Sequence, residues 1–128
     1  MIEPGNILND LTGQVIGVAI EVHKELGPGF QEHTYSKALS IELDIRGIKH
    51  QCEAPVSLQY KGQAIGDGRL DFLVEDKLVI ELKAIEQLHA VHHSQVLSYL
   101  KATRLPLGLL INFNVHMLKD GIQRIILS

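Results

Sequence analysis

Tryptophan is absent from this chain of 128 residues, only 5% of the residues are aromatic, and Cys52 is the single cysteine. One cysteine cannot form an internal disulfide, so no disulfide framework holds the fold together. Few aromatic side chains are left to stack on the bases of single-stranded nucleic acid. With 45% apolar and 21% charged residues, the composition is that of a globular protein whose core is packed mainly by aliphatic side chains.

Long apolar runs are also missing, because none approaches the roughly 20 residues that a membrane-spanning helix requires. Residues 1–6 lack the basic and apolar regions of a secretion signal. We therefore expect a cytoplasmic protein with no membrane partner. The chain length is typical of one domain, which we expect to occupy residues 1–128.

Positive charge is in deficit, because the formal net charge is -3. Proteins that hold nucleic acid through its phosphates usually carry a basic excess, which argues against a purely electrostatic nucleic-acid binder. Bound divalent cations would change this, since one brings -3 to -1 and two bring it to +1. Arg69, Lys101 and Arg104 are candidates for lining a groove, although solvated surface charge explains them at least as well.

Hydrophobic periodicity predicts two helices before any strand. Apolar residues recur every three or four positions over residues 7–26, and the segment 27–29, Gly-Pro-Gly, ends that helix. A second helix is predicted from about residue 34 to residue 46, with Gly47 as its cap. The stripe on the first helix suits a helix that covers a sheet, and a seam between two copies in a homo-oligomer remains an alternative.

Alternation of period two after Gly47 predicts strands. The predicted elements are strands around 56–60, 65–74 and 77–83, a helix over 87–102, a buried strand over 107–111 and an edge strand over 121–127. The order is α-α-β-β-β-α-β with a possible extra edge strand. It predicts an α/β fold in which helices flank a central mixed sheet of four to five strands.

A charged cluster is predicted on two of these strands. Residues two apart in a strand share a face, so Glu81 and Lys83 project to one side and Ile80 to the other. The short turn at residues 75–76 folds Asp71 back toward Glu81. Two carboxylates and an ammonium suit a site for Mg²⁺ or Mn²⁺. A surface salt bridge, worth about 0 to 1 kcal/mol, explains Glu81 and Lys83 nearly as well.

Asp71 and the triplet Glu81-Leu82-Lys83, in their strand-turn-strand setting, resemble the signature of the PD-(D/E)XK nuclease superfamily, with Leu70 where the name has proline. Residues 29–35, Gly-Phe-Gln-Glu-His-Thr-Tyr, look like the namesake motif of the GxxExxY family, a branch of that superfamily. Gln95 and Tyr99 are similar to the QxxxY helix motif of RecB-like nucleases. Further support comes from the segments 22–29, 60–62, 71–74, 81–84 and 109–113.

This resemblance implies a restriction-endonuclease-like core and a Mg²⁺- or Mn²⁺-dependent nuclease that hydrolyses phosphodiester bonds of DNA or RNA. It implies metal ligation by Asp71, Glu81, the backbone carbonyl of Leu82 and, directly or through water, Glu32. Lys83 would orient or help deprotonate the attacking water. The residues that would support the metal shell or the substrate are Gln95, Tyr99 and His92.

Three other interpretations stay open at this point. A protein that keeps the nuclease fold without turnover would bind nucleic acid or act in assembly. A hydrolase of small phosphate esters would use the same metal site without a nucleic-acid groove. His89, His92 and His93 lie on one side of the predicted helix and could bind zinc, but no fourth ligand stands at a matching spacing.

Overall fold

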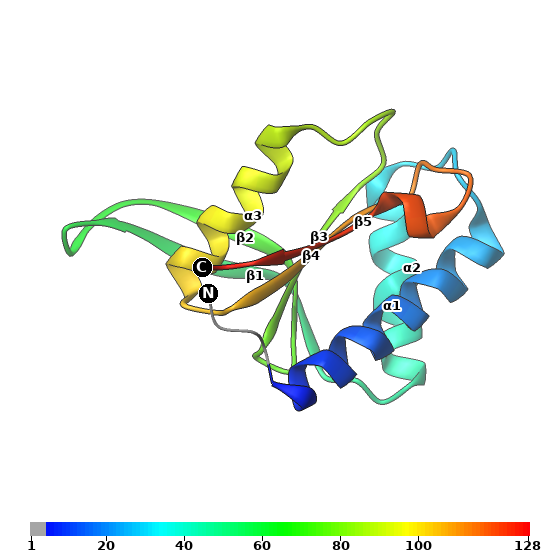
Figure 1. The fold of residues 1–128 in the computed structure, drawn as a ribbon, viewed down its shortest axis with the longest axis horizontal. Helices are drawn as coiled ribbons and strands as arrows, with labels where there is room; N and C mark the ends of the chain where they lie inside the picture. The colour runs from blue at the N-terminus through cyan, green and yellow to red at the C-terminus, as the bar shows by residue number, and fades with distance from the viewer. Residues whose placement is uncertain (1–4) are drawn as a thin grey trace.

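The computed structural model describes residues 5–128, and Figure 1 shows the arrangement of their helices and strands. In chain order the elements are α1 (Asn6–Leu26), α2 (Glu32–Ile45), β1 (His50–Tyr60), β2 (Gln63–Val74), β3 (Leu78–Lys83), α3 (Ala90–Thr103), β4 (Leu107–Asn112), a 3₁₀ turn η1 (Leu118–Gly121) and β5 (Ile122–Ile126). The strands form one sheet in the order β1-β2-β3-β4-β5. Only β3 and β4 pair in parallel, so the predicted mixed sheet is confirmed with five strands.

Helices cover both faces of the sheet. Ile80 and Leu82 of β3 lie in the core formed with α1 and α2. Val79 lies in the core on the opposite face, together with Val96 and Leu100 of α3. The apolar stripe of α1 is buried in this intramolecular core, so α1 covers the sheet as expected. Within residues 5–128, no helix combines the length and apolarity needed to cross a membrane.

Three predicted boundaries are wrong. The second helix begins at Glu32 rather than near residue 34, because the chain leaves the extended conformation directly after Gln31. The first strand begins at His50 rather than near residue 56, and the exposed polar residues 51–53 at its start gave no apolar alternation. The third helix begins at Ala90, three residues later than expected, because it is preceded by an extended His89.

β1 and β2 form a long hairpin that projects from the body of the molecule (Figure 1). Its turn at Lys61 and Gly62 has positive φ at both residues, 49° and 81°, as a tight hairpin turn requires. Every residue from 59 to 67 is exposed. The predicted turn is confirmed, and the tip of the hairpin belongs to neither core.

Partway along this hairpin, alternate side chains of β1 move from one face of the sheet to the other. The Sγ of Cys52 donates to the Oγ of Ser40 on α2 at 3.5 Å, whereas Ala54 is buried in the core under α3. Between them Glu53 has a φ of +50° and stands opposite Asp71 in the strand register. A positive φ in a strand reorients the residues that follow it. Asp71 therefore lies at the point where the hairpin passes from one face of the sheet to the other.

Candidate active site

The ladder between β2 and β3 stops where the carboxylates begin. Backbone pairing covers residues 72–74 of β2 and 78–80 of β3. At the next position the side chains replace the ladder, because the N–H of Asp71 donates to Glu81 Oε2 at 3.2 Å and the N–H of Leu82 donates to Asp71 Oδ2 at 2.7 Å. The two strands separate here with both carboxyl groups between them. The predicted convergence of Asp71 and Glu81 is confirmed.

The backbone carbonyl of Leu82 faces the same opening. In a strand the N–H and C=O of one residue point to the same side, and the next residue points to the other. The N–H of Leu82 points toward Asp71, whereas the C=O of Lys83 accepts from the N–H of Phe113 at 2.9 Å on the side of β4. The carbonyl of Leu82 therefore points toward the carboxyl pair.

Glu81 is held in an environment that opposes its ionisation. The residue is 5% exposed. Burial first, and then the hydrogen bond to Asp71 and the negative charge of that residue, raise the pKa of Glu81 to about 9, while the charge of Lys83 acts in the opposite direction. At neutral pH the pair therefore holds a proton. A divalent cation can take the place of that proton because it stabilises the ionised carboxylates, and hard oxygen donors of this kind fit Mg²⁺ or Mn²⁺.

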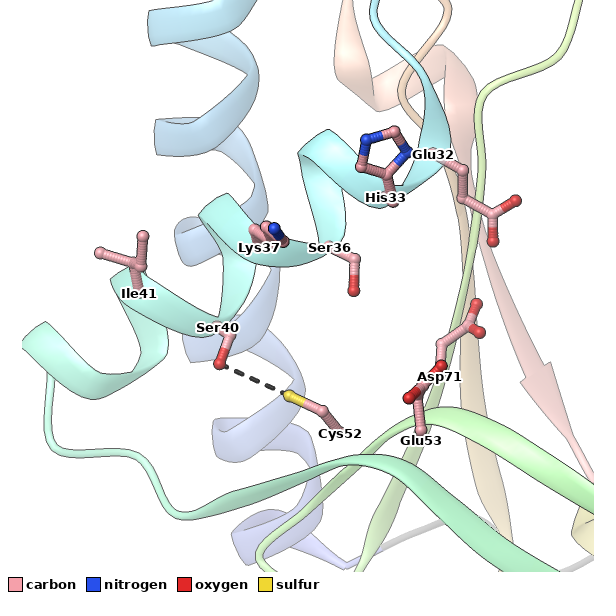
Figure 2. A pocket seen from close by; sticks show the side chains of 9 residues that line it. All are labelled: Glu32, His33, Ser36, Lys37, Ser40, Ile41, Cys52, Glu53 and Asp71. Atoms are coloured by element: carbon pink, nitrogen blue, oxygen red, sulfur yellow. Dashed lines mark hydrogen bonds between the residues drawn. The ribbon is translucent and has the colours of Figure 1, made fainter.

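Glu32 interacts electrostatically with Asp71 of this pair. It is the first residue of α2, and Figure 2 shows its carboxylate and that of Asp71 directed into the same space. Desolvation and the charge of Asp71 raise the pKa of Glu32, and the charge of Lys83 lowers it.

A cavity of about 730 Å³ lies between α2 and the hairpin beside these groups. Within residues 5–128, no three His, Cys, Asp or Glu side chains are close enough to hold one metal ion. Glu32 lines the same cavity as Asp71 but forms no such group of three with the carboxyl pair.

The glycine and tyrosine of the segment 29–35 explain how Glu32 is presented. Gly29 has a φ of +110°, which residues with a side chain rarely adopt. The hydroxyl of Tyr35, whose side chain is fully buried, accepts from the N–H of Phe30 at 3.2 Å and donates to the C=O of Gly27 at 2.6 Å. These bonds fix the loop that leads into α2. They set the position from which Glu32 extends.

The predicted supporting residues lie on α3. Tyr99 packs closely on Gly68, since a Cβ at Gly68 would stand 3.0 Å from Tyr99 Cε1. Gly68 is three residues from Asp71 on β2. Gln95 is exposed one turn earlier on the same helix.

His89 and His92 cap the N-terminal end of α3. His92 Nδ1 accepts from the N–H of His89 at 2.9 Å, and the rings of these two residues are 5.7 Å apart. His92 is half-buried. The described residues contain no group of three histidines, cysteines or carboxylates placed to bind a metal, so the zinc alternative gains no support.

Two residues beside the site were missed from sequence. Glu53 lines the same cavity as Glu32 and Asp71, but no periodic pattern marks its strand at that point. Asn112 is 2% exposed and pairs with both backbone groups of Ile85, accepting from its N–H at 3.1 Å and donating to its C=O at 2.9 Å. It fixes the chain just after Lys83. A polar residue directly after the apolar run 107–111 was the available signal for Asn112.

A carboxyl pair between two separating strands, with a lysine beside it and a third carboxylate on a preceding helix, defines a site suited to metal-assisted phosphate chemistry. Residues 9–125 match the family model of the PD-(D/E)XK nuclease superfamily, and the chain belongs to this superfamily. Enzymes of this superfamily generally use divalent metal ions. No curated protein matches the chain. The predicted superfamily and its fold are therefore confirmed, and the GxxExxY branch stays a prediction.

Proposed function

We propose that this chain is a Mg²⁺- or Mn²⁺-dependent nuclease of the GxxExxY branch, which hydrolyses phosphodiester bonds of DNA or RNA and leaves a 5'-phosphate and a 3'-hydroxyl. The observation that carries this proposal is the carboxyl pair Asp71 and Glu81, which replaces the backbone ladder between β2 and β3. Membership of a nuclease superfamily supports the same reaction.

The residues that would hold the metal are Asp71, Glu81 and the backbone carbonyl of Leu82. Glu32 lines the same cavity as Asp71 and would contribute directly or through a water molecule. When bound, the cation supplies Lewis acidity at the phosphoryl oxygen and lowers the pKa of a coordinated water. The remaining chemistry falls to the side chains around the site.

Lys83 would act on the attacking water. It shares the face of Glu81 on β3 and is half-buried, and its charge acts on both Glu81 and Glu32. An ammonium fixed at this position would orient the water and offset the negative charge that develops on the phosphoryl oxygens. Tyr99 and Gln95, together with His92, would position the substrate along α3.

A cleavage panel tests the proposal. Single-stranded, duplex and branched DNA and RNA are incubated with Mg²⁺ or Mn²⁺ and the parent, Glu81→Gln or Glu86→Gln, where Glu86 is an exposed glutamate just after β3. We expect the parent and Glu86→Gln to cut at least one substrate and Glu81→Gln to fall to background. Chelation of the metal should stop the reaction.

Two results would contradict the proposal: a parent protein that cuts nothing in the panel, and a Glu81→Gln variant that cuts as fast as the parent. A parent that binds nucleic acid without cutting it would favour the binding or assembly protein. Circular dichroism of each variant checks that the fold is intact.

A further inference from the structure

A second groove, of about 700 Å³, runs between the β1–β2 hairpin and α3. The hairpin lines it with residues 55–59 and Ile65, and α3 with Ser98 and the segment 101–104 around its C-terminal end. Figure 1 shows α3 lying across the base of the hairpin, which then projects beyond it. The groove is therefore open along a freely projecting arm of the molecule.

The charge of this groove is opposite to that of the whole chain. Lys101 and Arg104 line it, and none of its lining residues is acidic. Both side chains are exposed, and neither takes part in an ion pair among the described residues. Arg69 differs, since its guanidinium lies 4.0 Å from the carboxylate of Glu53. In a chain with a net charge of -3, two unpaired cations thus face one groove.

The backbone at the end of α3 adds a second observation. Arg104 caps the helix with φ 59° and ψ 34°, and its N–H bonds to the C=O of Leu100. Glycine or asparagine is the usual residue in this left-handed position, because a larger side chain is strained there. This conformation sets the backbone position from which the Arg104 side chain extends beside the groove.

The groove leads toward the carboxyl pair. Its lining begins at Pro55, which pairs with Arg69, and Arg69 is two residues from Asp71 on β2. Two strand residues span roughly 7 Å. Next along the hairpin, Val56 pairs with Gly68, on which Tyr99 packs. A strand of nucleic acid lying in the groove would reach the site within a few nucleotides.

We infer that this groove binds the phosphodiester backbone of a nucleic-acid strand, with Lys101 and Arg104 contacting successive phosphates. The identity of the ligand rests on the proposed nuclease function. The contact is to phosphate, so it is shared by DNA and RNA, and the experiment has an arm for each.

The test is fluorescence anisotropy with labelled single-stranded and duplex DNA and RNA oligonucleotides over a series of salt concentrations, with Ca²⁺ in place of Mg²⁺. Lys101→Gln/Arg104→Gln is compared with the parent and with Lys77→Gln/Lys119→Gln, which removes the same charge from exposed positions outside the groove. Lys101→Arg/Arg104→Lys keeps the charge. Hydrolysis of bis(4-nitrophenyl) phosphate with Mn²⁺ is measured in parallel, because that small diester needs the metal site but not the groove.

We expect the glutamine pair to weaken binding at least tenfold and to lower the salt dependence of log K by about 0.7 to 0.9 for each phosphate that is no longer neutralised. The control pair and the charge-preserving pair should bind like the parent, and all variants should hydrolyse the small diester equally. If the glutamine pair binds like the parent, or if the parent does not bind, the proposal that this groove binds nucleic acid is contradicted. Weakened binding by the glutamine pair supports the groove even if no variant hydrolyses the small diester. The absence of hydrolysis would count against the proposed nuclease function alone.

Discussion

Replacing Glu81 with glutamine should stabilise the metal-free protein at alkaline pH. Burial and the neighbouring Asp71 raise the pKa of Glu81 from 4.5 to about 9. Between these two values the folded protein retains a proton that the unfolded chain has lost, so the free energy of unfolding falls as pH rises through this window. Glutamine cannot ionise, and its amide oxygen can still accept the N–H of Asp71.

The size of the effect follows from how the free energy of unfolding depends on pH when the folded and unfolded states differ by one bound proton. One proton changes the free energy of unfolding by about 1.4 kcal/mol per pH unit, so the parent should lose up to about 3 kcal/mol between pH 6 and pH 8. For a domain of this size that corresponds to roughly 10 °C in Tm. The variant should lack this component of the pH dependence.

Urea unfolding followed by circular dichroism, with EDTA present, measures the difference at pH 6, 7 and 8. Subtracting the variant from the parent cancels the titration of the seven histidines, which both proteins share. Glu86→Gln serves as the control and should show the slope of the parent. A difference between parent and Glu81→Gln that stays constant with pH would refute the assignment of the retained proton to this pair.

Three further variants separate chemistry from structure. Lys83→Met should keep Mn²⁺ binding in calorimetry but slow cleavage, and unchanged cleavage would remove Lys83 from the reaction. Asn112→Ala should cost about 2 kcal/mol in urea unfolding, because both backbone groups of Ile85 lose their partner. Tyr35→Phe should cost about 1 kcal/mol and also reduce cleavage, since the loop before Glu32 loses two hydrogen bonds. Parent-like stability of either structural variant would contradict these roles.

The carboxyl pair was predictable from sequence because its geometry is local. Strand alternation and a short turn suffice to bring Asp71 near Glu81, and in the structure a three-residue turn, residues 75–77, connects the paired residues Val74 and Leu78. The separation of β2 from β3 at that position was not predictable, because it depends on side chains that displace backbone partners. The positive φ of Glu53 was also hidden, since nothing in its residue type requires a left-handed conformation.

The groove could not be predicted from sequence either, because it depends on contacts between distant segments. Lys101 and Arg104 were candidate groove residues from sequence, but only the crossover through α3 brings them beside Pro55 and the hairpin. The start of α2 has a similar cause. The hydrogen bonds of Tyr35 to the preceding loop set where the helix begins, and helical periodicity alone placed that start two residues late.

Calorimetric titration with Mn²⁺ at pH 7.5, in two buffers of different ionisation enthalpy, tests most directly whether Asp71 and Glu81 form a metal site. The parent and Glu86→Gln should bind Mn²⁺ and release about one proton as the cation displaces it from the pair. Glu81→Gln should show no such binding. Binding by the parent without proton release, or equal binding by Glu81→Gln, would contradict a metal site at the carboxyl pair.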